Sequence, residues 1–400
     1  MITLNKRIQG IKGSATLILK EKADKLIASG RKIINLGPGE PDIDTPDHIK
    51  EAAYKAIREG KTKYLAVAGL PALRAAIANK LVSENKIPVD TDSVIVTNGG
   101  KQAILSAMDV VLEPGDEVII PAPYWVSYPE MAKLAGGVPV IIPSDPANRY
   151  RLKPEVLKNY ITPRSRILIL NSPSNPSGAS YSKQELEGLS ELIIKHNLTV
   201  ISDEVYEKIV YDGYVSNSIA SLGKELAERT ITVNALSKTY SMTGWRVGYA
   251  AGPKHIISAM IRHQGQTTSN VCSIAQYAGL AAVTGDHSFL PPLIESYKRR
   301  RDLGLAAIEN MTGCSVVEKP EGAFFLFIRC EKLFGKSAAN GSMMKSSQDL
   351  ANLFLEDAGV ALLPGVEFGD DGAIRISYAL SDSELKAGLD AMVATIRKLN

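Results

Sequence analysis

VNALSKTYSMTGWRVGYAAG, residues 233–252, carries the strongest structural signal in this chain. An apolar run at 230–233 leads into it, and small and hydroxyl-bearing residues connect Lys238 to a second apolar run at 247–250. This pattern predicts a strand, a loop that holds Lys238, and a further strand. A lysine at the end of a buried strand is partly removed from water, which lowers the pKa of its amine and makes the amine nucleophilic. Because most single lysines are simply solvated, this interpretation depends on the rest of the chain.

The composition is that of an ordinary globular protein. Hydrophobic residues make up 45% and charged residues 22% of the chain, and a net charge of +3 is too small to indicate nucleic-acid binding. The sequence shows neither a secretory signal nor an apolar run long enough to span a bilayer. Its three cysteines have no metal-type spacing, and its five histidines form no HExxH motif. We therefore expect a cytoplasmic protein with reduced thiols, no metal site, and no nucleic-acid or membrane partner.

Short apolar runs alternate with helical patterns through the middle of the chain. We expect strands at 94–97, 117–120, 138–142, 167–170, 199–202, 231–233 and 247–250. Helices are expected between several of them, at 101–112, 128–135 and 182–196. Strands separated by helices predict a largely parallel sheet that is covered by helices on both faces.

A chain of 400 residues exceeds what one hydrophobic core usually supports, so we expect two domains. Outside the central region, the pattern of expected helices and strands changes. Helices are expected at 14–29, 46–59, 71–84, 293–309, 347–358 and 383–399, and strands at 33–36, 315–318, 323–328, 360–363 and 374–378. Mixed helices and strands after residue 291 suit a smaller α+β domain. We predict a large domain at 46–290, and a small domain that combines 1–45 with 291–400.

Polar and aromatic residues gather at the predicted carboxyl ends of the central strands, where open α/β sheets bind their ligands. These residues are Gly99, Gly100, Trp125, Asn175, Asp203, Tyr206 and Lys238.

This set fits the needs of pyridoxal phosphate. A lysine amine can hold the cofactor aldehyde, and Asp203 can keep the ring nitrogen protonated so that the ring absorbs electrons. Tyr206 and Asn175 can bond the ring oxygen, and Trp125 offers a flat face for stacking. The phosphate requires backbone N–H groups at a helix start, a hydroxyl and a guanidinium, which are available from Gly99, Gly100, Ser237 and Arg246.

Seven motifs occur in one order along most of the chain. They are GPGEPD at 37–42, YLAVAGLPAL at 64–73, NGGKQ at 98–102, PYWVSY at 123–128, NSPSNPSG at 171–178, SDEVY at 202–206, and the block at 237–248. With them, the chain resembles a fold-type I pyridoxal-phosphate enzyme of the class I aminotransferases, in the aspartate aminotransferase branch of bacteria and archaea. The resemblance implies a large domain with a mostly parallel seven-stranded sheet between helices, plus a smaller α+β domain.

The resemblance also implies a role for each residue that matches a family motif. Lys238 would carry the cofactor as a Schiff base (aldimine) and shuttle the substrate α-proton. The other expected cofactor contacts are Asp203, Tyr206, Asn175, Trp125, Gly99, Gly100, Ser237 and Arg246, with Tyr64 reaching the phosphate of a neighbouring subunit. The expected substrate contacts are Arg375, which would clamp the α-carboxylate, together with Gly39, Trp125, Asn175 and Lys101.

Two positions need comment. Ala235 stands where the lysine signature usually has Gly or Ser, and its small side chain leaves the assignment intact. Lys101 would meet the distal carboxylate of a dicarboxylic substrate. It lies in a first helical turn, where a cation gains nothing from the helix dipole, and this placement favours a functional role; a solvated helix lysine is the alternative.

We therefore predict a homodimeric aminotransferase with shared active sites. It would transfer the amino group between an L-amino acid, aspartate above all, and 2-oxoglutarate by a ping-pong mechanism. Aromatic amino acids or prephenate are alternative substrates. Two other classes share the cofactor or the scaffold: a pyridoxal-phosphate-dependent β-eliminating lyase and a ligand sensor of the kind found in some transcription regulators. A sensor would need a DNA-binding segment, and no helix-turn-helix pattern fits residues 1–36.

Overall fold

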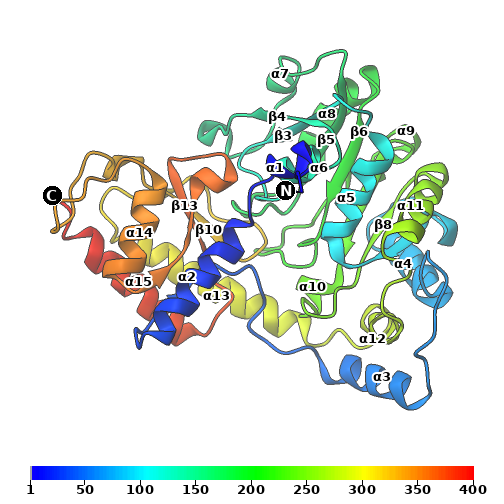
Figure 1. Ribbon diagram of the computed structural model, residues 1–400, viewed down its shortest axis with the longest axis horizontal. Coiled ribbons are helices and arrows are strands. Elements are labelled where there is room, and N and C mark those ends of the chain that lie inside the picture. Colours follow the sequence, from blue (N-terminus) through cyan, green and yellow to red (C-terminus); the bar gives the residue numbers. More distant parts are fainter. Residues whose placement is uncertain (1) are drawn as a thin grey trace.

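The computed structural model describes residues 2–400, and its centre is a seven-stranded sheet (Figure 1). The strand order is β2-β8-β7-β6-β5-β3-β4. The strands are β2 (Val94–Thr97), β3 (Glu117–Pro121), β4 (Val138–Ile142), β5 (Ser165–Asn171), β6 (Thr199–Asp203), β7 (Thr230–Ala235) and β8 (Gly248–Ala251). Only β8 runs antiparallel to its two neighbours, β2 and β7. The predicted mostly parallel sheet is confirmed.

Each central strand is apolar on both sides because helices cover both faces of the sheet. Along β5, Ile167 and Ile169 pack into the core beneath α5 (Gly99–Val111), α6 (Tyr128–Leu134) and α11 (Lys254–Thr267). The intervening Leu168 and Leu170 pack on the opposite face, beneath α8 (Lys183–Lys195) and α9 (Lys224–Ala227). A third apolar cluster joins the β2–β8 edge to α3 (Asp47–Arg58), α4 (Pro71–Ser83) and α12 (Ser273–Thr284).

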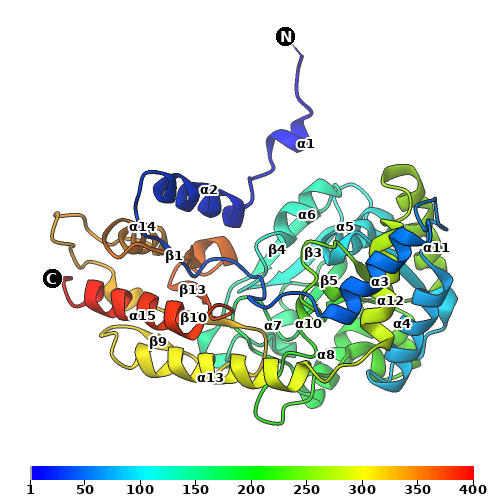
Figure 2. The same ribbon diagram turned by 90° about the horizontal axis from the view of Figure 1, so that it is seen from below.

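A second body of structure combines the C-terminal part with the N-terminal segment (Figures 1 and 2). A four-stranded antiparallel sheet has the order β12-β13-β10-β9, and a two-stranded parallel sheet pairs β1 with β11. The strands are β1 (Ile34–Asn35), β9 (Ser315–Val316), β10 (Phe325–Arg329), β11 (Val360–Ala361), β12 (Leu363–Pro364) and β13 (Ala373–Ser377). The accompanying helices are α2 (Ala15–Ala28), α13 (Leu290–Ile308), α14 (Ser347–Asp357) and α15 (Asp382–Ile396). Because β1 pairs with β11, we propose that 1–45 and 291–400 form one unit and 46–290 the other.

Three sequence-based expectations are corrected. Lys238 does not lie on a loop but in a short helix, α10 (Leu236–Thr239), directly after β7. The single strand expected at 360–363 is two, because β11 pairs with β1 whereas β12 pairs with β13. The helices α11 and α12 were not predicted.

Two further short helices, α1 (Lys6–Gln9) and α7 (Pro154–Leu157), complete the set. Within residues 2–400, no helix combines the length and the apolar character that crossing a bilayer requires.

Candidate active site

A cavity of about 470 Å³ opens beyond the carboxyl ends of the central strands. The last residues of β5, β6 and β7, which are Asn171, Asp203 and Ala235, all line it. Asn35, the last residue of β1, and residues 37–40 line it as well, and Arg375 of β13 reaches it from the second body. The cavity therefore lies where the two parts of the chain meet, at the position that open parallel sheets provide for ligands.

Most of the predicted site residues share this cavity. Its lining includes Gly39, Gly100, Lys101, Trp125, Asn175, Asp203, Tyr206, Ser237, Lys238, Arg246 and Arg375. Gly99 lies next to it, because a Cβ at Gly99 would come within 2.6 Å of the Arg246 guanidinium. Tyr64 does not line the cavity, and the residue is 90% exposed.

The amine of Lys238 points into the cavity and donates a hydrogen bond to the backbone oxygen of Gly39. Burial lowers the pKa of Lys238 to about 8. The carboxylate of Glu40 opposes this shift, whereas the positive charges of Arg375 and Arg246 add to it. At neutral pH a usable fraction of this amine is therefore unprotonated, as nucleophilic or base chemistry requires.

Replacement of Lys238 by methionine is expected to stabilise the cofactor-free protein by about 1–3 kcal/mol at pH 7. A folded-state pKa of about 8, below the ordinary 10.5, means that folding costs free energy while the unfolded lysine is protonated. This gain in unfolding free energy should be complete below pH 8, shrink as the pH rises from 8 to 10.5, and vanish above pH 10.5. Urea unfolding across this pH range measures it. A gain that does not change with pH would contradict the explanation.

Asp203 ends β6 as a buried carboxylate. Its Oδ2 accepts a hydrogen bond of 2.6 Å from the phenol of Tyr128, and the amide of Asn171 donates to its backbone oxygen at 3.0 Å. Burial raises the pKa of Asp203 to about 6, and the Tyr128 hydrogen bond opposes that rise. A buried anion with so few donors favours a cationic partner in the cavity. Sequence reasoning missed Tyr128, although it lies in the PYWVSY motif.

Arg375 is a buried cation at the other side of the cavity. Its Nη1 donates to Asn175 Oδ1 at 2.9 Å and its Nη2 donates to the Gly37 backbone oxygen. The guanidinium carbon lies 4.3 Å from the ring centre of Phe325 and 5.0 Å from that of Phe368. Burial lowers the pKa of Arg375 to about 10, so it remains charged at neutral pH. Its Nε has no hydrogen-bond partner, which leaves a buried donor for a carboxylate.

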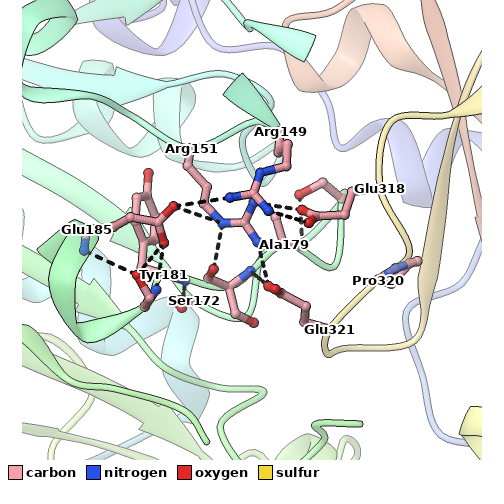
Figure 3. A network of polar contacts seen from close by, with 12 residues as sticks. Arg149, Arg151, Ser172, Ala179, Tyr181, Glu185, Glu318, Pro320 and Glu321 are labelled. Carbon is pink, nitrogen blue, oxygen red and sulfur yellow. Dashed lines mark hydrogen bonds and ion pairs between the residues drawn. The ribbon is translucent and has the colours of Figure 1, made fainter. Parts of the chain in front are cut away.

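Arg151 and the carboxylates of Glu318 and Glu321 form a charged network that anchors the loop that carries Asn175 (Figure 3). Arg151 contacts Glu318 at 2.7 Å and Glu321 at 2.6 Å, and its Nε donates to the Ser180 backbone oxygen at 2.7 Å. The Ser180 N–H in turn donates to Glu321 at 2.9 Å. These bonds tie the Asn175 loop to the segment between β9 and β10, so both bodies support the Asn175–Arg375 contact.

The N-terminus of α5 and the segment before β8 form a cradle that fits a phosphate. Gly99 has a φ of +78°, and a Cβ on Gly248 would lie 2.5 Å from the Gly99 carbonyl carbon, so the two backbones require glycine to approach this closely. Arg246 is held here by its Nη1, which donates to the Thr243 backbone oxygen at 3.0 Å. The first N–H groups of α5, the Ser237 hydroxyl and the Arg246 guanidinium together form an anion-binding set.

Trp125 and Lys101 form the wall beside this cradle. The Trp125 ring packs edge-on against Tyr128, with ring centres 5.4 Å apart. The Lys101 amine lies 5.1 Å from the centre of the Trp125 ring. Burial, reinforced by the charge of Arg246, lowers the pKa of Lys101. The neighbouring positive charges of Lys101 and Arg246 favour a ligand that carries more than one negative charge.

Several lining residues were not predicted. Glu40 accepts a hydrogen bond from the Thr243 hydroxyl, and it was detectable as the neighbour of Gly39 in the GPGEPD motif. Leu17 and Leu19 of α2 also line the cavity. No motif marks them, because only folding brings α2 to the cavity.

The conserved-family model described as "Aminotransferase class I and II" matches residues 31–392. The chain belongs to this family. A probable aspartate/prephenate aminotransferase of Rickettsia bellii is 46% identical over 96% of this chain and 97% of its own length. The structure of an aspartate aminotransferase from Rhizobium meliloti is similar with a TM-score of 0.97 at 43% identity, over 100% of both chains. An aspartate aminotransferase from Thermus thermophilus with maleate has a TM-score of 0.92 at 41% identity, over 99% of this chain and 100% of its own. The aminotransferase prediction is confirmed at the level of the family.

Proposed function

We propose that this aminotransferase uses pyridoxal phosphate to exchange the amino group between L-aspartate and 2-oxoglutarate. The observation that carries the proposal is the convergence of three buried or part-buried groups in one cavity. These are the Lys238 amine with its lowered pKa, the Asp203 carboxylate, and the Arg375 guanidinium with a free N–H. They provide a nucleophile and base, an anion and a carboxylate clamp.

The residues present fit the cofactor. The cradle of Gly99, Gly100, Ser237 and Arg246 would hold the phosphate, which the close backbone approach at Gly248 supports. Asp203 would pair with the ring nitrogen, Tyr206 and Asn175 would bond the ring oxygen, and Trp125 would cover the ring face. Burial raises the pKa of the Tyr206 phenol, so Tyr206 would act as a hydrogen-bond donor.

When bound, pyridoxal phosphate supplies an aldehyde that captures amino groups and a ring that absorbs the electron pair left by a departing α-proton. The protein supplies the proton transfer. Lys238 Nζ, released by the incoming amino acid, would take the proton from the substrate α-carbon and return it to the product side. Asp203 would favour the electron-poor ring by keeping a negative charge beside it, which its hydrogen bond from Tyr128 maintains.

The two carboxylates of the substrate would be bound by different cations. Arg375 would hold the α-carboxylate, beside the Gly39 backbone, and Lys101 would meet the distal one. The related Thermus enzyme with maleate, itself a small dicarboxylate, supports this class of ligand. Prephenate is a second candidate, because the relative from Rickettsia bellii bears that name and because Leu17 and Leu19 give the cavity an apolar wall.

Replacement of Lys101 by alanine is expected to lower kcat/KM for aspartate by about tenfold to a hundredfold, as expected for a lost charge-assisted hydrogen bond. It should change kcat/KM for alanine, which lacks the distal carboxylate, by less than about threefold. A panel of amino donors and oxo-acid acceptors measures the contrast, with Lys133→Ala as an outer-surface control. Equal losses for both donors would assign Lys101 to the phosphate cradle instead.

A half-reaction separates transamination from elimination. Aspartate added to the loaded enzyme should yield one equivalent of oxaloacetate per site and the aminated cofactor, without ammonia. Ammonia release without cofactor amination would replace the transaminase with a β-eliminating lyase.

We also propose a homodimer in which Tyr64 completes the phosphate site of the partner. Its 90% exposed phenol lies outside its own cavity, which supports a role in another subunit. The free thiols of Cys272, Cys314 and Cys330 support a reducing compartment, so we propose that the enzyme acts in the cytoplasm.

A further inference from the structure

The segment that carries Tyr64, residues 61–70, has no regular secondary structure, yet it is tied down at several points. Its first part is exposed and includes Tyr64, whereas Ala68 and Gly69 are buried. The segment satisfies few of its own backbone groups, one of them the Gly69 N–H, which donates to the Ala66 oxygen at 2.9 Å. Its other buried N–H and C=O groups need partners outside the segment, and these come from α11, α12 and β2.

Gln276 of α12 holds the end of the segment. Its side chain is fully buried, its Oε1 accepts from the Leu70 N–H at 2.6 Å, and its Nε2 donates to the Val271 backbone oxygen at 2.8 Å. Gly69, with a φ of +111°, lies so close that a Cβ there would approach this Oε1 to 3.2 Å and Val96 to 2.5 Å. The backbone at Gly69 therefore packs directly against the Gln276 amide and leaves no room for a side chain.

Gln264 of α11 holds the middle of the segment in the same way. It is fully buried, and its Nε2 donates to the backbone oxygens of Val67 at 2.9 Å and Val96 at 3.0 Å. The Val96 N–H donates to the Ala68 oxygen at 2.9 Å, so the segment is fastened to β2, the strand that leads to Gly99. At the start of the segment, Ser273 of α12 donates to the Lys61 oxygen at 2.7 Å.

Burying two amides is costly unless their hydrogen bonds are made, and one acceptor, Gln264 Oε1, has no partner. The two amides satisfy the Leu70 N–H and the Val67 oxygen, which apolar residues of similar volume would leave unpaired. What the amides achieve is a fixed backbone beneath an exposed phenol.

We infer that Gln264 and Gln276 are positioning residues that act in trans, by fixing Tyr64 for the active site of a second copy of this chain. This inference rests on the proposed shared-site dimer. The two glutamines touch neither cofactor nor substrate of their own subunit, since neither lines the cavity. Their effect should therefore appear in the affinity of the partner's site for pyridoxal phosphate.

Gln276→Met removes both hydrogen bonds and nearly preserves volume. The cofactor Kd of the mutant homodimer should rise about tenfold to a hundredfold, as expected for one lost charge-assisted bond to the phosphate. Tyr64→Phe should raise this Kd by a similar factor. The double mutant should have the same Kd as Tyr64→Phe alone. Additive losses would overturn the inference. Gln264→Met provides the same comparison if Gln276→Met does not fold.

Hybrid dimers, purified through two different affinity tags, test the action in trans. With Lys238→Ala on one subunit and Gln276→Met on the other, the one lysine-bearing site receives Tyr64 from a subunit with an intact Gln276. That site should bind pyridoxal phosphate with wild-type affinity, measured by absorbance of the lysine-bound cofactor. With both substitutions on the same subunit, the remaining site should bind it weakly. The reverse result would show that Gln276 acts within its own subunit.

The same two hybrid dimers, made with Tyr64→Phe in place of Gln276→Met, test the proposed shared-site dimer separately from the role of the glutamines. If Tyr64→Phe shows no difference between the arrangements, the shared-site dimer itself is wrong. If Tyr64→Phe shows the difference and both glutamine variants do not, only the inference fails. Thr230→Val, which deletes a buried hydrogen bond of 2.7 Å to Leu226 at the far end of β7, controls for general destabilisation. Hydrogen exchange of the amides in 61–70 should quicken in the glutamine variants of the cofactor-free dimer and not in Thr230→Val.

Discussion

Lys238→Ala is expected to reduce the turnover of aspartate by at least about 10⁴-fold, because in the proposed function this one side chain provides both the covalent attachment of the cofactor and the proton transfer. A methyl group can do neither, and among the described residues that line the cavity Lys101 is the only other lysine. The Lys101 amine lies over Trp125, on the cradle side of the cavity. Arg375 also lines the cavity, but burial lowers its pKa only to about 10, so it stays protonated at neutral pH.

Single-turnover kinetics measure this loss directly. The enzyme loaded with pyridoxal phosphate is mixed with aspartate, and oxaloacetate formation is followed over time. Lys101→Ala is the matched control, since it removes the other lysine of the cavity and should leave the half-reaction measurable. Wild-type turnover by Lys238→Ala would refute the whole cofactor assignment.

Asp203→Asn is expected to lower kcat by about 10²–10³-fold, the loss seen when one preorganised electrostatic contact to a developing charge is removed. The substitution preserves size and can still accept the 2.6 Å hydrogen bond of Tyr128. What it removes is the negative charge that would keep the ring nitrogen protonated. The effect should fall on kcat more than on KM, because the charge matters most when the α-proton leaves.

Tyr128→Phe is the graded companion of Asp203→Asn. It leaves the carboxylate in place but deletes the hydrogen bond that opposes the rise in the Asp203 pKa. We expect a loss of about tenfold, at the low end for a hydrogen bond to a charged group. Steady-state kinetics for both variants, together with their cofactor affinities, check this order. A Tyr128→Phe defect equal to that of Asp203→Asn would mean that geometry, rather than charge, limits the reaction.

The central sheet could be predicted because its strands are short apolar runs between helical patterns. The site could be predicted because its polar residues stand at the strand ends, in motifs such as SDEVY. Residues 236–239 were expected as a loop, because four residues are too few to show a helical period. The helix α12 was missed because it is mostly apolar, with buried alanines and glycine and little polar contrast. Such a helix shows no amphipathic pattern to detect.

Other features depend on contacts between distant segments. The register that separates β11 from β12 follows from the β1 pairing, which no local pattern encodes. The same holds for Leu17 and Leu19 at the cavity and for the Tyr128–Asp203 bond, whose partners are 75 residues apart. The role of Gln264 and Gln276 could not be predicted either, because single buried glutamines look like surface residues in a sequence.

The reversed direction of β8 has a consequence for how this enzyme can change over evolution. Because β8 runs antiparallel to β7, the chain returns to the same edge of the sheet without a crossover helix, and Gly248 pairs with Ala235. Lys238 and Arg246 therefore belong to one continuous connection, residues 236–247. Insertions or deletions in any covering helix leave their separation unaltered. The proposed attachment point of the cofactor and the proposed phosphate-binding arginine can therefore be inherited together, while the helices around them remain free to lengthen, shorten and diverge.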